Sequence, residues 1–400
     1  MRKMNKKASA FCISLLLLST LTFQDLAIVR SITGEEEIEY YVKSTVTYSN
    51  KGDKVWNFTE REEDRTIGLF MNNSWQTAYL VNSTLSIETI ENDTDGNQVA
   101  VLQFPEMLLD QGQNISYAAT YRVVSKPRTL DNVNETASKS LNNIPVSLKE
   151  KYLRAEGPWL INNTEIQNLA YNITKNETKV LTIVKNFVIW IDKTVTNPEK
   201  MHEVPQYPNE TVTKREGDCD DKAILLVTLC RIIGIPTFIQ IGAIYKEDFP
   251  SRLENISYWK NHVTAVQKRI GWHGWAMVYI PPWGWLPVDL TYVFRPIAED
   301  PLNAIKNAAV TSQITIQYMN ISQTDYVASS QEAMDFLITN SFHVYMEDEM
   351  IEITRQKNPF GEIMEWMFPV VLVVAAALLL ASSYVIARRW KREEEIPTAS

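Results

Sequence analysis

The first third of the chain alternates between short hydrophobic runs and polar turns. Six runs rich in β-branched and aromatic residues lie between Glu36 and Pro127, separated by segments such as Asn-Lys-Gly and Asp-Gly-Asn. This pattern is typical of strands joined by turns. The runs are 40–48, 66–70, 76–80, 85–90, 99–104 and 115–124. We predict a β-sandwich over residues 36–127 and interpret it as a spacer or binding module, because it carries no clustered Cys, His or paired carboxylates.

The hydrophobic pattern changes to helical spacing after a polar, irregular segment at 128–158, which we interpret as a linker. Apolar residues recur every three or four positions in two stripes over 163–196, and a third stripe runs from Ala223 to Ile233. Gly234 ends the third stripe. After it, the pattern predicts strands at 238–245, 272–280, 285–290, 314–321 and 342–353, and helices at 301–308 and from a capping box at Ser329 to 340. These elements predict an α+β domain over residues 159–355.

Two apolar segments lie outside this globular pattern. Residues 1–7 are basic and residues 8–23 are apolar and uncharged, so we expect a signal peptide or signal anchor over 1–28. Residues 366–387 carry no charge and as a helix would span roughly 33 Å, enough to cross a bilayer. Basic residues open the tail at 388–400, which predicts that this tail is cytoplasmic. We therefore expect a single-pass cell-membrane protein whose N-terminal ectodomain lies outside.

Composition agrees with an external location. Sequons of the form Asn-X-Ser/Thr are dense and none lies in the tail, so we interpret them as candidate glycosylation sites. They are Asn57, Asn72, Asn82, Asn92, Asn114, Asn134, Asn162, Asn172, Asn176, Asn209, Asn255 and Asn320. The net charge is −9. The chain has no basic stripe, which argues against a nucleic-acid partner.

One cysteine lies at the start of the third helical stripe. Cys219 follows Asp218, a good N-cap residue, so the helix dipole and free N–H groups there favour a thiolate. Cys230 would lie about 16 Å further along the helix, too far for a disulfide. We interpret Cys230 as a small buried apolar residue. Cys219, at an exposed helix end, is a candidate nucleophile.

A cysteine nucleophile needs a base and a group that orients the base. The acidic residues Glu216, Asp218, Asp220 and Asp221 oppose a thiolate electrostatically, so a histidine partner is required. The chain has His202 in a Pro-flanked loop, His262 in a polar segment, His273 at the start of a strand, and His343 on a late strand. We choose His273 because the hairpin that follows it can bring back a carboxylate.

That carboxylate is Asp289, which would accept from one ring nitrogen and fix the tautomer. A tight hairpin centred on Pro282-Trp283 would pair Asp289 with Ala276, on the wrong face for His273. A bulge or a shifted register is therefore required, and Pro287 is a plausible place for it.

Several motifs occur together and in order. They are Gly217-Asp218-Cys219-Asp220-Asp221, Leu229-Cys230-Arg231, Gly234-Ile235-Pro236, His273-Gly274-Trp275, and Gly284-Trp285 before Val288-Asp289. Over roughly 160–295 they resemble the core of the transglutaminase-like superfamily, and the preceding strands resemble sandwich domains of membrane-anchored microbial members. Gly274 stands where Ala is common, and Leu290 where Pro is common.

The resemblance implies a papain-like fold and a catalytic triad of Cys219, His273 and Asp289. It implies attack on an extracellular protein or peptide carboxamide through a thioester, followed by crosslinking or hydrolysis. Trp275, Trp283 and Trp285 are interpreted as core and groove walls. The calcium loops of the animal enzymes are not recognisable, so we assign no metal and no cofactor. The alternative is a catalytically silent surface protein used for binding or for cell-envelope architecture.

Overall fold

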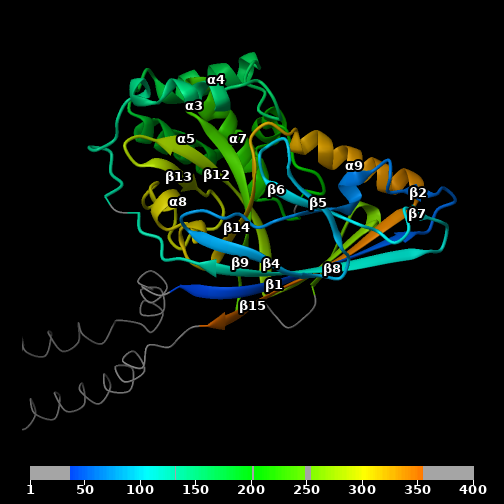
Figure 1. Cartoon of the computed structure of the whole chain (residues 1–400). Coiled ribbons are helices and arrows are strands. Elements are labelled where there is room, and N and C mark those ends of the chain that lie inside the picture. The colour runs from blue at the N-terminus through cyan, green and yellow to red at the C-terminus, as the bar shows by residue number, and fades with distance from the viewer. Residues whose placement is uncertain (1–36, 131, 201, 248–253, 355–400) are drawn as a thin grey trace, which may run out of the picture. The chain divides into compact units, whose positions relative to one another are not determined.

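Two β-sheets organise the computed structural model, which describes residues 37–130, 132–200, 202–247 and 254–354 (Figure 1). The expected signal at 1–28, membrane segment at 366–387 and tail at 388–400 lie outside these residues. Within the described part of the chain, no helix is both long and apolar enough to cross a membrane.

The first sheet joins strands from both ends of the described chain. Its order is β10 (Glu254–Tyr258), β11 (Val263–Lys268), β15 (Phe342–Thr354), β1 (Ile38–Asn50), β8 (Asn114–Ser125) and β4 (Gln76–Ser83). Smaller sheets flank it: β3 (Thr66–Gly68) with β6 (Gln98–Leu102) and β5 (Ile87–Asn92), and β2 (Trp56–Asn57) with β7 (Leu108–Leu109).

The predicted self-contained sandwich over 36–127 is therefore not what the structure has, although all six predicted strands form. An edge strand exposes unpaired backbone N–H and C=O groups. Here β15 covers the edge of β1, and β11 pairs in parallel with β15. The Ser44 hydroxyl also donates to Asp348 across 304 positions of sequence. By contact, the described residues up to Ile353 form one unit.

The second sheet carries the helices. Its order is β13 (Gly284–Val288), β12 (Ile270–Ile280), β9 (Thr237–Tyr245) and β14 (Thr315–Ile321). The helices of the described chain are α3 (Val146–Tyr152), α4 (Thr164–Thr174), α5 (Val180–Thr194), α6 (Pro208–Lys214), α7 (Cys219–Ile233), α8 (Asn303–Lys306) and α9 (Tyr326–Asn340). Helix α7 contacts β12 and β9 directly, and α4 and α5 pack against α7.

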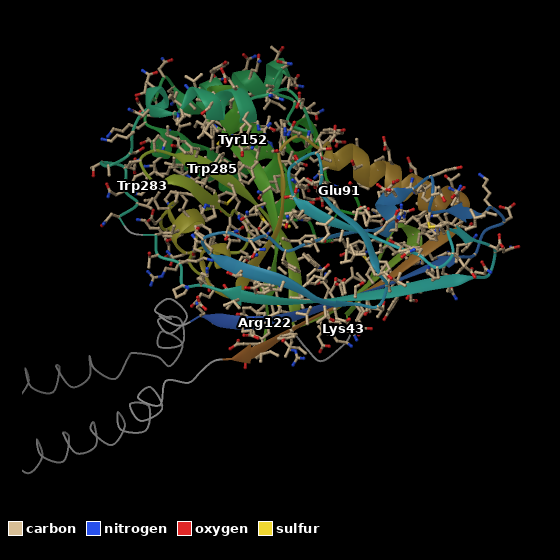
Figure 2. The ribbon with its side chains drawn as sticks, in the orientation of Figure 1. Lys43, Glu91, Arg122, Tyr152, Trp283 and Trp285 are labelled. Carbon is tan, nitrogen blue, oxygen red and sulfur yellow. The ribbon has the colours of Figure 1, made fainter. Side chains whose placement is uncertain are left out.

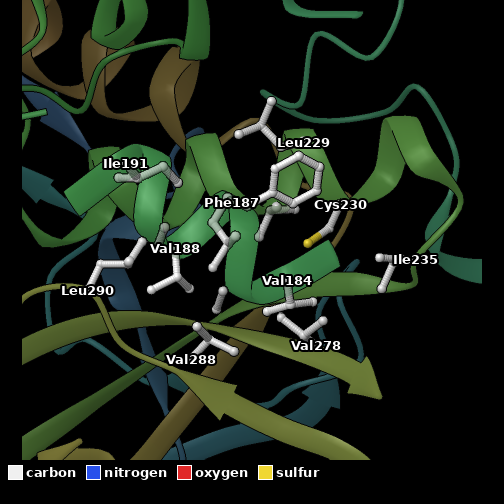
Figure 3. Close-up of a cluster of buried hydrophobic side chains, with 14 of the residues drawn as sticks. Val184, Phe187, Val188, Ile191, Leu229, Cys230, Ile235, Val278, Val288 and Leu290 are labelled. Carbon is white, nitrogen blue, oxygen red and sulfur yellow. The ribbon is translucent and has the colours of Figure 1, made fainter. Parts of the chain in front are cut away.

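Helix α7 lies inside the core rather than on its surface. Figure 3 shows Phe187 and Val184 of α5 near Cys230 of α7, with Val278 and Val288 of the sheet beneath. These five side chains are all buried. Close packing on this scale makes the position of α7 stiff, since buried side chains interdigitate with few voids. The first residue of α7 is therefore held firmly against the sheet.

Two boundaries differ from the sequence-based expectation. The predicted linker 128–158 contains α3, and its Tyr152 ring packs edge-on against Trp285 at 5.0 Å between centroids (Figure 2). Helix α9 begins at Tyr326 rather than at Ser329, because Asp325 caps it by accepting from the Ala328 N–H at 3.0 Å.

Candidate active site

The β12–β13 hairpin decides which side chains share a face. Ile280 pairs with Gly284 and Ala276 with Val288, so the loop has three residues, Pro281 to Trp283. Gly284 has φ 85°, the left-handed conformation that such a loop requires and that glycine adopts without strain. The predicted register shift therefore occurs at the turn.

This register places Asp289 beyond the last pair, where continued pairing would set it opposite Trp275. Trp275 lies two residues from His273 and so shares its face. Asp289 is thereby on the face that the sequence required. The predicted bulge at Pro287 is not present, because Pro287 pairs regularly with Met277.

His273 and Asp289 form a buried pair. His273 Nε2 lies 2.8 Å from Asp289 Oδ2, and the two residues are 8% and 1% exposed. An ionised carboxylate can only accept a hydrogen bond, so His273 Nε2 carries the proton in this contact. Asp289 Oδ1 accepts from the backbone N–H groups of Thr291 at 2.9 Å and Tyr292 at 3.1 Å, and from the Thr291 hydroxyl at 3.1 Å.

The electrostatics of the pair follow from these contacts. Burial raises the pKa of Asp289, but His273 and the N–H groups of Thr291 and Tyr292 outweigh it and leave the pKa below its ordinary value. Burial lowers the pKa of His273, but the charge of Asp289 and hydrogen bonds to Asp289 and Cys219 outweigh that effect. The pKa of His273 is raised to about 10.

Cys219 is the first residue of α7, and its first turn lies directly on β12. A Cβ added to Gly274 would come 3.8 Å from Asp220 Cβ and 3.1 Å from Ile241 Cδ1. A side chain at position 274 would thus be in ordinary van der Waals contact with Asp220, so the first turn of α7 lies close to the strand. This closeness explains why the Cys219 thiol contributes to the raised pKa of His273.

The two other histidines in the later part of the chain, His262 and His343, lie elsewhere. His262 and His343 stack on each other with centroids 4.4 Å apart. His262 Nδ1 lies 2.7 Å from the Phe342 carbonyl, and His343 Nδ1 lies 3.2 Å from the Asn261 carbonyl. Of the late histidines, His273 is thus the one that the structure brings to Cys219.

The acidic residues around Cys219 have partners that the sequence pattern did not predict. Asp221 is 0% exposed. It accepts from Gln206 N at 2.6 Å, Gln206 Nε2 at 3.0 Å and Asp218 N at 3.1 Å, and its Oδ2 lies 2.6 Å from His202 Nδ1. Asp218 is the N-cap residue, and its Oδ2 accepts from the His202 N–H at 3.1 Å. A histidine interpreted as a loop residue therefore lies against the start of α7.

Asp220, the residue after Cys219, has a partner on α9. Burial, a hydrogen bond to Asp218 and the Cys219 sulfur raise the pKa of Asp220 well above its ordinary value. The Tyr326 hydroxyl donates to Asp220 Oδ2 at 3.4 Å. A raised pKa favours the neutral acid, which lessens the negative charge beside Cys219.

Two groups of side chains have spacing that could suit a metal ion: His202, Asp218 and Asp221, and Asp218, Cys219 and Asp220. In the first group the four contacts described above already surround Asp221, which leaves little capacity for a cation. In the second group an ion would bind the sulfur itself. Both groups fit a hydrogen-bonded helix start better than a metal site.

A groove of about 480 Å³ lies between α6 and α9 and the loop before α6. Within the described residues its lining is Val204, Pro205, Gln206, Tyr207, Glu210, Lys214, Val327, Ala328, Gln331 and Glu332. Gln206 contacts Asp221, and Tyr326 next to Val327 contacts Asp220. The groove therefore reaches residues that contact Asp220 and Asp221 at the start of α7, whereas Cys219 is not part of this lining.

The region that holds Cys219, His273 and Asp289 matches a known protein family. Residues 167–290, which include α7, β12 and Asp289, match the family profile described as the transglutaminase-like superfamily. These residues form a transglutaminase-like domain. No curated protein sequence matches the chain significantly.

Several solved structures are similar to this chain at low sequence identity. A candidate cysteine protease from Cytophaga hutchinsonii is 15% identical, with 80% of this chain and 92% of that chain covered and a TM-score of 0.49. The periplasmic domain of TgpA from Pseudomonas aeruginosa is 14% identical, with 69% and 93% covered and a TM-score of 0.31. Red sea bream transglutaminase is 10% identical, with 64% and 48% covered and a TM-score of 0.27.

Proposed function

We propose that the protein is a cysteine acyltransferase or peptidase that attacks protein carboxamides outside the cell. The observation that carries the proposal is the buried His273–Asp289 pair, 2.8 Å apart, on the strand against which the helix of Cys219 begins. Cys219, His273 and Asp289 are the proposed nucleophile, base and orienting group. The transglutaminase-like profile over 167–290 supports this assignment.

The proposed reaction begins with proton transfer from the Cys219 thiol to His273 Nδ1, while Asp289 holds Nε2–H. The sulfur then attacks the carboxamide carbon, and the carboxamide oxygen takes up the electron pair of the C=O bond. The backbone N–H of Cys219, at the start of α7, is the natural donor to that oxygen. When the C–N bond breaks, His273 returns the proton to the leaving nitrogen, and a Cys219 thioester remains.

The second half of the reaction releases the acyl group. An amine or a water molecule loses a proton to His273 and attacks the thioester carbon, and the sulfur leaves as a thiolate that regains the proton. An amine acceptor gives crosslinking, and water gives hydrolysis. We propose no metal and no cofactor for either half.

A location at the cell surface is also part of the proposal. It rests on the sequence of residues 1–28 and 366–387 and on the sequons. All sequon asparagines except Asn255 have described side chains, and each of these is exposed or half-buried. Their accessibility supports, but does not require, glycosylation.

The test uses the full-length protein with glutamine-containing peptides and hydroxylamine as the acceptor amine. The expected result is a peptide hydroxamate, with a rate that falls at least about a thousandfold in Cys219→Ala. Ser330→Ala, a change on α9, is the matched control and should keep the rate. A wild-type rate no greater than that of Cys219→Ala, across peptides and acceptors, would favour the catalytically silent binding protein instead.

A further inference from the structure

The start of α7 concentrates negative charge around the proposed nucleophile. Asp218 precedes Cys219, and Asp221 and Glu216 lie within three residues of it, whereas the raised pKa of Asp220 favours its neutral acid. Each ionised carboxylate near a sulfur disfavours the thiolate. The helix dipole favours a thiolate by only about 1 kcal/mol. A compensating positive group on this side of the helix would therefore matter to the chemistry.

His202 occupies that place. Its Nδ1 lies 2.6 Å from Asp221 Oδ2, its Nε2 lies 3.5 Å from Glu216 Oε1, and its backbone N–H donates to Asp218 Oδ2 at 3.1 Å. One residue thus contacts Asp218, Asp221 and Glu216 together. Its side chain is 22% exposed and that of Asp221 is 0% exposed, so the ring closes the cluster from the solvent side.

The segment that follows His202 is held at two points. Gln206 donates from its backbone and its amide to Asp221, and from its amide to the Glu216 carbonyl at 3.0 Å. Glu203 accepts at its carbonyl from Trp259 Nε1 at 2.6 Å. The ring is therefore held against α7 by its neighbours, which is what a positioning group requires.

The charge of His202 agrees with this position. Burial lowers the pKa of His202, but the hydrogen bond and charge of Asp221, with Asp218 and Glu216, outweigh it, and the pKa is raised. The raised pKa thus favours the imidazolium. The other titratable groups that face the Cys219 sulfur are Asp220 and Lys222 of α7, His273 of β12, Tyr258 of β10 and Tyr326 of α9.

We propose that His202 is a positioning residue for Cys219: it holds the Asp218–Cys219 turn through Asp221 and, as an imidazolium, offsets the carboxylates that oppose the thiolate. The inference rests on the proposed function only because that function makes the reactivity of the Cys219 thiol important. The reactivity of the thiol can be measured without any substrate.

The experiment compares the rate of Cys219 alkylation by iodoacetamide in the wild type, His202→Gln and His343→Gln. A glutamine at position 202 can still donate to Asp221 but carries no charge. At about pH 6 the His202→Gln rate should fall by roughly three- to tenfold, and the two rates should converge once the pH exceeds the raised pKa of His202 and the wild-type ring is neutral. His343→Gln, whose ring stacks on His262, should match the wild type throughout.

A second measurement covers the case in which His202→Gln does not fold. The titration of the His202 ring is followed by NMR in the wild type and in Cys219→Ala. Because linkage is reciprocal, loss of the thiolate should move the titration of His202 to lower pH. Superimposable alkylation profiles in a folded His202→Gln variant, or an identical His202 titration in both proteins, would overturn the proposal. If the alkylation rates change as expected but no substrate is turned over, the result would instead count against the proposed function alone.

Discussion

Replacing Asp289 with asparagine tests the electrostatics of the site with almost no change of shape. The amide oxygen of the new side chain can still accept from Thr291 and Tyr292, as Asp289 does at 2.9 and 3.1 Å. Its amide nitrogen would face His273 Nε2 and donate to it. The ring would then carry its proton on Nδ1, toward Cys219, and would have no lone pair with which to accept the thiol proton.

The size of the effect follows from the pKa of His273. The value of about 10 lies well above the ordinary 6.5, although burial alone would lower it. The difference corresponds to roughly 5 kcal/mol, which is the net of the favourable interaction with Asp289 and Cys219 and the opposing cost of burial. Loss of the carboxylate should therefore lower the pKa of His273 by at least about 2 units and reduce turnover by roughly a thousandfold or more.

The assay is an NMR titration of the His273 ring together with the pH profile of Cys219 alkylation. Asp348→Asn is the matched control, because Asp348 is also a buried carboxylate, bonded to Ser44 and to Trp272 on β12. The control should leave the titration of His273 unchanged. A ring that still titrates near pH 10 in a folded Asp289→Asn variant would refute the proposed role of Asp289.

Three further predictions concern labelling, the hairpin and stability. Burial raises the pKa of Cys230 to about 12, so iodoacetamide should modify Cys219 at least about a hundredfold faster at neutral pH, and equal rates by peptide mapping would contradict this. Gly284→Ala and Gly112→Ala each place a side chain at positive φ in open space, so urea unfolding should show each to cost about 1–2 kcal/mol, but only Gly284→Ala should slow Cys219 labelling; equal labelling would refute the role of the turn. Because the pKa of His273 is raised, its contribution to stability is complete below about pH 6.5 and is lost as pH rises towards 10; the free energy of unfolding should therefore fall less over this range in His273→Gln, and parallel curves would argue against it.

Local elements could be predicted from the sequence because their signals are local. The apolar stripe before Gly234 gives α7, and the alternation over 272–280 gives β12. Sheet membership could not be predicted in this way. The pairing of β15 with β1 joins strands from opposite ends of the described chain, and β10 and β11 lie in a stretch with no strong pattern. Hydrophobic periodicity states which face is buried but not which strand lies beside it.

The same distinction between local signals and long-range contacts applies to the candidate site. Spacing and resemblance pointed to Cys219, His273 and Asp289, while the register that brings Asp289 to His273 depends on the length of the loop before Gly284. Asp289-Leu290-Thr291 carries the Asx-turn signal that explains its backbone donors. His202 lies in an irregular segment with no periodicity, so only the fold reveals its contact with Asp221.

The central claim is that the Cys219 sulfur forms a covalent acyl intermediate. The most direct measurement is mass spectrometry of the full-length protein after rapid acid quench from a mixture with carboxamide peptides. The account predicts an acyl group that maps to Cys219, that hydroxylamine removes, and that is absent in Cys219→Ala and strongly reduced in His273→Ala. An acyl group that forms equally well in His273→Ala, or that maps to another residue, would contradict it.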